Sequence, residues 1–372
     1  MLELRVRPEI LSYETCADFV AAHHFTPRDV ILTRSSIQSA FLERFALPAR
    51  VILQNRFGAG EPTDAMADAI LREFNQQPCD RLFAIGGGTV IDIAKVLAVS
   101  DGTLRVDDMY ADMGALRARH ELVIVPTTCG TGSEVTNIAI LHRTRLGTKM
   151  GLVSDGMYAS RAVLVPELLS ALPYGVFATS SLDALVHAVE SALSGKATPT
   201  TLLFSLRALE MIIRGYRVIA ENGPEARMPL LRDFLHASTY AGIAFGTAGC
   251  AAVHALSYPL GGVFHVPHGE ANYSLFLEVL RAYAETGIRD SLRRVLDLLA
   301  ALLHCRADEA LDRLGALLEA ILPLKRLRDY GMTEKELREF PPMVLAAQQR
   351  LLANNYAPLS EARIRAIYTA RW

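Results

Sequence analysis

The sequence has few of the features that mark secreted or membrane-bound proteins. Its five cysteines are an odd number without a CxxC pair, which argues against a disulfide framework or a zinc knuckle and for reduced thiols. No window reaches the ~18 uncharged apolar residues of a membrane span. Charges interrupt the first ten residues, where a secretion signal needs an apolar run. We therefore expect a cytoplasmic protein with no membrane partner.

An excess of positive charge is also missing. The chain has 38 Lys and Arg against 40 Asp and Glu, a net charge of −2, which argues against binding to nucleic acid or to a membrane surface. It has no internal repeat and no low-complexity linker. What it does have is length: 372 residues, of which 51% are hydrophobic, are enough for two domains with large cores.

Short apolar runs and helical patterns alternate in the first half of the chain. This alternation predicts a parallel sheet with helices on both faces, whose ligands bind beyond the carboxyl ends of the strands. From about Pro166 the strand-like runs nearly vanish and helical spacing takes over. We predict an α/β dinucleotide-binding domain over 1–162 and an all-helical, metal-binding domain over 163–372. The predicted strands are 29–34, 50–55, 81–88 and 121–128, and the predicted helices between them are 36–46, 62–77 and 89–100.

Two glycine-rich stretches follow consecutive predicted strands. The first, "AIGGGTVIDIAK", places glycines between a strand and a helix start, where backbone N–H groups attract a phosphate. It is not GxGxxG, and taken alone it also fits an ordinary tight turn. The second, "VPTTCGTGSEVTN", offers hydroxyls and lies on the same edge of the sheet. Together they indicate a nucleotide site, with candidate residues Gly86, Gly87, Gly88, Thr89, Thr127, Thr128 and Thr131.

Histidines gather in the stretch "HALSYPLGGVFHVPHGEANY", which contains His254, His265 and His268. Upstream, Asp183 and His187 are four residues apart on a predicted helix, so both side chains lie on one face. Alone, that pair fits a partly buried helical histidine better than a metal site. Together with His254 and His268 it offers one oxygen and three nitrogen ligands, which suit Fe²⁺, Zn²⁺ or similar ions. Spacing alone does not exclude His265 as a ligand.

Four motifs carry a family resemblance over nearly the whole chain. In order and separation, "GGGTVIDIAK", "PTTCGTGSEVT", "DALVHAVES" and "HALSYPLGGVFHVPHGEANY" resemble the iron-containing (group III) alcohol dehydrogenases. The resemblance implies the architecture shared with dehydroquinate synthase, NAD or NADP as cofactor, Fe²⁺ or Zn²⁺ as metal, and a homo-oligomer, expected to be a dimer. It implies Asp183, His187, His254 and His268 as metal ligands. It adds Asp92 and Lys149 to the cofactor residues and makes His265 a pocket residue.

Three positions depart from the family pattern. A histidine to which the family gives a part in proton transfer is Tyr258 here, which can also exchange a proton or can simply fill the wall of the site. The acidic residue that bonds a ribose 2′-hydroxyl is Arg34 here, which favours a 2′-phosphate and makes NADP credible unless it only faces solvent. The family's Asn-Pro is Glu61-Pro62, for which the sequence offers no account.

The tyrosine variant, with "SYPLGG" and "HVPHGEANY", resembles one branch of the family, the 4-hydroxybutyrate dehydrogenases. The resemblance implies interconversion of 4-hydroxybutyrate and succinate semialdehyde, with Tyr258 and His265 at the reacting end. The substrate carboxylate then needs a donor, for which His265, Arg143 and Arg145 are candidates. Open alternatives are a dehydrogenase for butanol or 1,3-propanediol, a zinc enzyme like glycerol dehydrogenase, and an idle nucleotide sensor. The Lys, Arg and Asn cluster of a dehydroquinate synthase is not evident.

Overall fold

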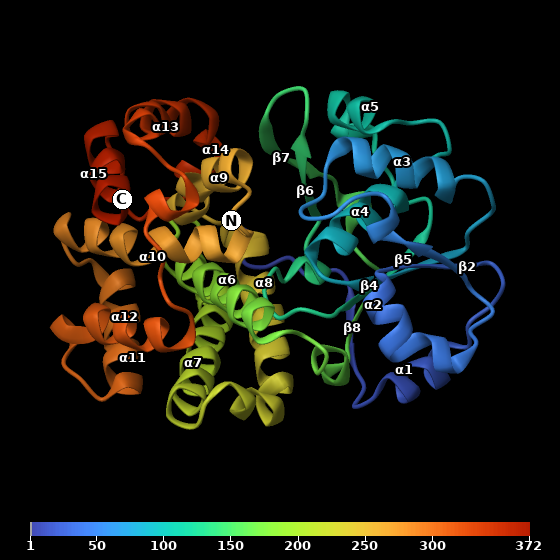
Figure 1. The fold of residues 1–372 in the computed structure, drawn as a ribbon, viewed down its shortest axis with the longest axis horizontal. Helices are drawn as coiled ribbons and strands as arrows, with labels where there is room; N and C mark the ends of the chain where they lie inside the picture. Colours follow the sequence, from blue (N-terminus) through green and yellow to red (C-terminus); the bar gives the residue numbers. More distant parts are fainter. Residues whose placement is uncertain (1) are drawn as a thin grey trace. The chain divides into compact units, whose positions relative to one another are not determined.

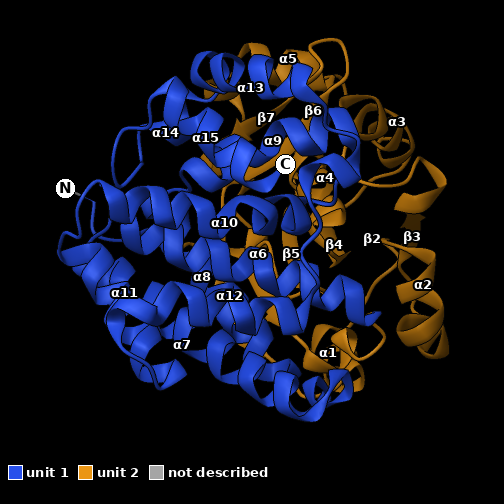
Figure 2. Cartoon of the chain, turned by 60° about the vertical axis from the view of Figure 1, so that its left-hand side comes forward, with its two compact units in different colours: residues 1–5, 173–372 blue, residues 6–172 orange. Residues whose placement is uncertain are grey.

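The computed structural model describes residues 2–372, and the chain divides into two compact units (Figure 2). Unit 2 is Val6–Leu172. Unit 1 is Pro173–Trp372 together with the start of the chain up to Arg5. The boundary predicted between residues 162 and 163 falls inside unit 2, within strand β8 (Arg161–Leu164). Unit 2 therefore ends about ten residues later in the chain than the sequence pattern predicts, because the sheet includes β8 and the turn that follows it.

A six-stranded sheet forms the centre of unit 2, and all of its strands are parallel. Gly86 of β4 lies level with Pro126 of β5, so the glycine-rich stretches that follow these strands leave the same edge of the sheet. The predicted parallel sheet is confirmed. In spatial order the strands are β1 (Glu9–Ser12), β8, β5 (Glu121–Pro126), β4 (Arg81–Gly86), β2 (Asp29–Thr33) and β3 (Arg50–Leu53).

Alternation along the strands gives the sheet two apolar faces. Val30 and Leu32 of β2 join one hydrophobic cluster, and Ile31 between them joins the other. Helices α3 (Asp64–Phe74), α4 (Gly88–Ala98) and α5 (Val106–Ala111) cover the first face, and α1 (Cys16–His23) covers the second (Figure 1). Two strands outside this sheet, β6 (Ile138–Arg143) and β7 (Thr148–Val153), form an antiparallel pair.

The helices of unit 2 follow the predicted ones with local differences. In α3 the Thr63 hydroxyl accepts a hydrogen bond from Met66 N at 3.0 Å, so Thr63 is the N-cap and Pro62 stands just before it. The segment predicted as one helix over 36–46 is three short pieces: α2 (Ser35–Ile37), a π-helical turn over Gln38–Leu42 and a 3₁₀ turn over Glu43–Phe45.

The regular elements within residues 173–372 of unit 1 are all helices. Its central helix α6 has every residue from Ser181 to Leu193 buried, because α7, α8 and α10 pack around it. The predicted helical second half is confirmed. The helices are α6 (Tyr174–Leu193), α7 (Pro199–Asn222), α8 (Leu231–Ala248), α9 (Ala252–Phe264), α10 (His268–Glu285), α11 (Asp290–Leu303), α12 (Ala310–Ile321), α13 (Glu334–Ala347), α14 (Gln349–Leu352) and α15 (Glu361–Arg371).

No single helix within residues 2–372 has both the length and the apolar character needed to cross a membrane. One pair of segments, Pro224–Ala248 and Ala252–Phe264, meets that test together, by length and composition only, and is bent by 105° at its break.

Helices α6 and α10 approach each other closely at Gly269. A β-carbon placed on Gly269 would lie 1.9 Å from the carbonyl oxygen of Thr179 and 3.2 Å from Cβ of Asp183. Neither atom can move without shifting the backbone of α6, so only glycine fits here. This contact fixes the start of α10 beside the middle of α6.

Gly269→Ala should therefore destabilise the protein by about 1–3 kcal/mol, since the added methyl group forces the two backbones apart. Gly175→Ala is the matched control on α6, because a β-carbon there meets nothing within 4 Å and alanine favours the helix. Thermal unfolding of both variants tests this. A melting temperature for Gly269→Ala equal to that of Gly175→Ala would contradict the close contact.

Candidate metal centre

Four side chains from three helices of unit 1 converge on one point. Asp183 and His187 come from α6, His254 from the first turn of α9, and His268 is the first residue of α10; Figure 1 shows these helices adjacent to one another. Their ligand atoms all lie within 4.8 Å of one another. Asp183 Oδ1 is 3.6 Å from His268 Nε2 and 3.8 Å from His254 Nε2, and the Nε2 atoms of His187 and His254 are 2.9 Å apart.

Burial makes this cluster unlike ordinary surface groups. The side chains of Asp183, His187 and His254 are only 3%, 6% and 4% exposed, whereas that of His268 is 30% exposed. The His268 side is therefore the one open to an incoming molecule. Burial by itself would raise the pKa of Asp183, but the imidazoles of His187, His268 and His254 offset it and hold that pKa below its ordinary value. The carboxylate is thus kept ionised, as a metal ligand must be.

A buried amide steadies the Asp183 carboxylate. Asn272 Nδ2 donates to Asp183 Oδ1 at 2.8 Å, and Ser257 Oγ donates to Asn272 Oδ1. Both supporting residues are buried, and the sequence pattern alone did not single them out. Asn272 lies four residues after His268 on α10, so helical spacing was the available signal. The spacing does not reveal which partner the amide takes.

Of the two candidates for the reacting end, Tyr258 lies on the same helix as His254, and His265 directly follows the end of that helix. Tyr258 is buried, with its ring centroid 6.2 Å from that of His268. His265 is exposed and ends α9 in the left-handed conformation, with φ of 55°. Three other non-glycine residues also have positive φ, and helix ends commonly use this conformation, so the backbone of His265 is not itself evidence of function. The catalytic parts of both residues stay predictions.

The two glycine-rich stretches meet in unit 2. A β-carbon on Gly87 would lie 3.1 Å from Cγ2 of Thr128, and one on Gly88 would lie 2.9 Å from Cγ2 of Thr131. Thr127 N donates to Gly86 O at 3.0 Å. Gly87 is the N-cap of α4 and offers no side-chain cap, so the N–H groups of the first turn have no hydroxyl or carboxylate of the N-cap residue to satisfy them. This end of the helix suits a phosphate group.

Asp92 lies on α4, four residues after Gly88. Its carboxylate oxygens accept hydrogen bonds from Ser133 Oγ at 2.8 Å and Ile140 N at 2.9 Å. Nearby, the buried Lys95 donates to Ser133 Oγ, Thr136 Oγ1 and the carbonyl of Ile138. Burial lowers the pKa of Lys95 to about 8, against the opposing pull of Asp92 and Glu134. This network holds the loop after β5, and a direct contact of Asp92 with a cofactor stays a prediction.

Three further predicted cofactor residues take clear positions in unit 2. Arg34 follows β2 directly and is exposed, on the same edge of the sheet as Gly86. Thr89 Oγ1 donates to Gly60 O at 3.1 Å. Lys149 of β7, with its side chain 5% exposed, forms an ion pair with Glu61. The pair gives a physical reason for glutamate at position 61, because it supplies the counter-charge that a buried lysine needs.

The donor sets fit the groups that the sequence implies. Three imidazoles and one carboxylate on buried helices are a suitable set for a divalent transition metal. Glycines whose missing β-carbons would strike neighbouring threonines, at the start of a helix, are a suitable cradle for a diphosphate. Each set lies within a single unit of the chain. The structure therefore brings together the predicted metal residues, and separately the predicted nucleotide turns.

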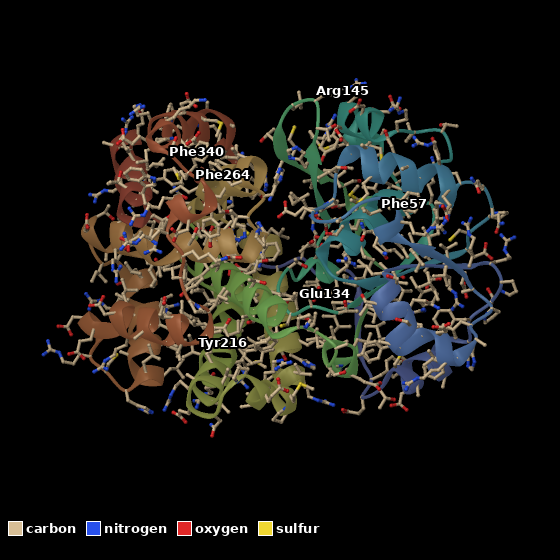
Figure 3. All side chains as sticks on the ribbon, in the orientation of Figure 1. Phe57, Glu134, Arg145, Tyr216, Phe264 and Phe340 are labelled. Atoms are coloured by element: carbon tan, nitrogen blue, oxygen red, sulfur yellow. The ribbon has the colours of Figure 1, made fainter. Side chains whose placement is uncertain are left out.

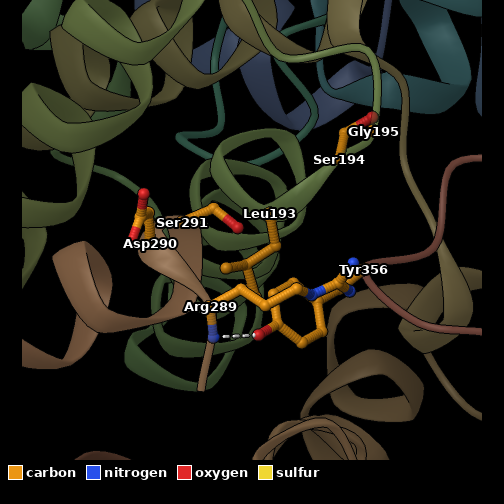
Figure 4. Close-up of a pocket in the computed structure, with 7 residues that line it drawn as sticks. All are labelled: Leu193, Ser194, Gly195, Arg289, Asp290, Ser291 and Tyr356. Carbon is orange, nitrogen blue, oxygen red and sulfur yellow. Dashed lines mark hydrogen bonds between the residues drawn. The ribbon is translucent and has the colours of Figure 1, made fainter. Parts of the chain in front are cut away.

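Two hollows elsewhere in the described residues do not contain such sets. One hollow, of about 450 Å³, lies in unit 1 beside Leu193, Arg289 and Tyr356, which Figure 4 draws as sticks. The Arg289 guanidinium lies 4.0 Å above the Tyr356 ring, and Arg289 N donates to the Tyr356 hydroxyl. A second cavity, of about 660 Å³, lies in unit 2 beside Met113 and Asp155. None of the predicted site residues lines either one.

His254→Ala and His268→Ala should each lose bound metal while the fold survives, because each removes one of four ligands from a site held by three helices. His236→Ala is the control, since His236 is half-buried on α8, away from the cluster, and its Nδ1 bonds the backbone of its own helix at Arg232 O. Metal content after loading with Zn²⁺ or Fe²⁺ and gel filtration is the measurement. Full occupancy in both ligand variants would refute the assignment.

Comparison with known proteins matches both parts of the chain to one family. A family model described as iron-containing alcohol dehydrogenase matches residues 13–166, and one described as the C-terminal part of the Fe-containing alcohol dehydrogenase family matches residues 177–372. The chain is 45% identical over 363 residues to 4-hydroxybutyrate dehydrogenase of Clostridium kluyveri, with 97% of each chain covered. It is 38% identical over 310 residues to long-chain-alcohol dehydrogenase 1 of Geobacillus thermodenitrificans, covering 78% of this chain and 74% of that one.

Solved structures share the fold. A crystal structure of 1,3-propanediol oxidoreductase superposes with a TM-score of 0.86 at 24% identity over the full length of both chains. A sulfoacetaldehyde reductase from Bifidobacterium kashiwanohense, solved with NAD⁺, does so with a TM-score of 0.83 at 24% identity, covering 100% of this chain and 99% of that one. The resemblance carried by the four motifs is confirmed: the chain belongs to the iron-containing alcohol dehydrogenase family.

Proposed function

We propose that this chain is a metal-dependent NAD(P) alcohol dehydrogenase that interconverts 4-hydroxybutyrate and succinate semialdehyde. The observation that carries the proposal is the buried cluster of Asp183, His187, His254 and His268, in which one carboxylate and three imidazoles face one another. The similarity to the C. kluyveri enzyme supports the choice of substrate. The homo-oligomeric, dimeric state and the cytoplasmic location stay predictions.

The roles of the residues follow from their positions. Asp183, His187, His254 and His268 would hold the ion, and the exposed side at His268 would admit the substrate oxygen. When bound, the ion would polarise the C–O bond and the nicotinamide would exchange the hydride. Gly87, Gly88, Thr128 and Thr131 would bind the diphosphate through the turns that follow β4 and β5. Tyr258, the neighbour of His268, is the candidate to hold the alcohol proton at its hydroxyl.

The substrate carboxylate needs a donor of its own, and the structure narrows the choice. Arg143 is not free for this part, because it pairs with Asp64 and Asp107 and lies 4.0 Å over the Tyr110 ring. Arg145 lies in the turn between β6 and β7 (Figure 3), 84% exposed and 3.8 Å from Asp107. A charge so exposed adds little selectivity. We therefore assign the carboxylate to His265, which directly follows the helix that carries His254 and Tyr258 and lies in the same unit as the metal residues.

Succinate semialdehyde should be reduced with a higher kcat/KM than butyraldehyde. A charge-assisted hydrogen bond to the carboxylate contributes ~1–3 kcal/mol. This corresponds to a difference of about one to two decades in kcat/KM. Both aldehydes are compared at one pH with the same metal. The alternative is an enzyme for a neutral alcohol such as butanol or 1,3-propanediol, or a zinc enzyme that prefers glycerol. Equal values, or a preference for butyraldehyde, would support that alternative and leave family membership untouched.

We expect the chain to bind NAD(H) and to accept NADP(H) better than members with an acidic residue in place of Arg34, and Arg34→Asp should lower the use of NADP(H) relative to NAD(H). An arginine at the end of β2 pairs with a 2′-phosphate, whereas an aspartate repels it and accepts a hydrogen bond from a 2′-hydroxyl. The ratio of kcat/KM with NADPH to that with NADH should fall by about tenfold or more, the worth of one such charge pair. Arg28→Asp, on a residue that pairs with Asp80, is the control. An unchanged ratio in Arg34→Asp would show that Arg34 has no part in selection.

A further inference from the structure

Glu190 is a buried carboxylate on the same helix as two of the candidate ligands. It lies seven residues after Asp183 and three after His187, and its side chain is 3% exposed. Three N–H groups surround it. Glu190 Oε1 accepts from Val253 N at 2.6 Å, and Oε2 accepts from Ala251 N at 3.0 Å. The third partner of Glu190 is Nδ1 of His254, 2.6 Å from Oε2.

This arrangement decides which nitrogen of His254 carries the proton. Two backbone N–H groups can only donate, so the Glu190 oxygens act as acceptors towards α9. An ionised carboxylate is an acceptor only, and His254 Nδ1 must then donate to it. In the neutral imidazole the other nitrogen, Nε2, is left with its lone pair. That nitrogen faces His187 and Asp183, which is where a metal ligand is needed.

We propose that Glu190 is a positioning residue for the metal centre: it fixes the tautomer and the ring orientation of His254 and makes Nε2 a stronger ligand. The inference rests on the proposed function, because it takes His254 to be a metal ligand. The inference goes beyond the proposed function because it assigns a role to a residue that would touch neither the metal nor the substrate. Carboxylate partners of ligating histidines act in this way at metal sites in general.

A different interpretation of the same residues is a second metal site. Glu190, Cys250 and His254 also have ligand atoms within 4.8 Å of one another. The hydrogen bonds argue against it. Both Glu190 oxygens and His254 Nδ1 are already engaged with one another or with the backbone around the start of α9, so an ion at this place would have to displace three hydrogen bonds. The geometry therefore favours one metal per chain, with Glu190 supporting it from outside.

The test is the affinity of Glu190→Gln for Zn²⁺, measured on the full chain by competition with a chromophoric chelator. Glutamine keeps the shape and can still accept from α9, but it removes the charge and one acceptor oxygen. We expect the Zn²⁺ affinity to fall by about 10- to 100-fold, the usual loss for such a partner. The melting temperature of the metal-free protein reports the purely structural part of the change.

Ser191→Ala is the control. It removes a neighbouring buried hydrogen bond, the one to Ser205 Oγ, and leaves the contact between Glu190 and His254 in place.

A double-mutant cycle separates positioning from a general loosening of the fold. If Glu190 acts through His254, then Glu190→Gln should not weaken further the residual Zn²⁺ affinity that Asp183, His187 and His268 provide in the His254→Ala background. An unchanged Zn²⁺ affinity in Glu190→Gln, an equal loss in Ser191→Ala, or an undiminished effect without His254 would each overturn the inference. So would two Zn²⁺ per chain that fall to one in Cys250→Ser. If the wild-type chain binds no metal at all, the proposed function fails, and that outcome is distinct from these.

Discussion

The arrangement of unit 1 depends on one constraint: helix α6 carries polar side chains on the part of it that is buried on all sides. A carboxylate and imidazoles cannot remain in an apolar interior without partners, because an unpaired polar group there costs several kcal/mol. Helix α6 carries Asp183, His187 and Glu190 in its fully buried part. The start of α9 supplies N–H donors to Glu190, and α10 supplies an amide to Asp183. Helices α9 and α10 are thus held by polar contacts to α6, and the same contacts bring the candidate ligands together.

Much of the fold follows from local pattern, and the exceptions have physical causes. The strands β2, β3, β4 and β5 are short apolar runs between turn signals, and they lie where the pattern predicts. The edge strand β1 escapes notice because its residues are largely exposed and show no apolar run. Helix α9 contains Pro259 and two adjacent glycines, which are poor helix formers, and yet it is continuous from Ala252 to Phe264. Burial of its apolar residues against neighbouring helices outweighs the poor helix propensity, which is a tertiary effect that a short window of sequence does not contain.

The candidate site, like the fold, is only partly predictable from the sequence. Residue types and a family resemblance predict the ligand set, and the structure adds the distances. The supporting residues were missed because Glu190 and Asn272 look like any polar residue on a helix until their partners from other helices are known. The partners of Arg143 and Lys149 are not evident from sequence for the same reason, since Asp64, Asp107 and Glu61 all lie far away in sequence. Spacing along one helix is readable from sequence, whereas pairing between distant elements is not.

The division of the chain has a consequence for the order in which unit 1 can be assembled. Its first described residues precede all of unit 2 in sequence, and they are tied to helices made much later. Glu3 O accepts the hydroxyl of Thr198 at 2.7 Å, and Arg5 N donates to Thr247 Oγ1 at 3.1 Å. During synthesis these residues are made before unit 2, whereas α7 and α8, to which they bond, are made only after it. A piece of the chain starting at Pro173 would keep every candidate ligand but would lose the carbonyl that accepts from the N-cap of α7.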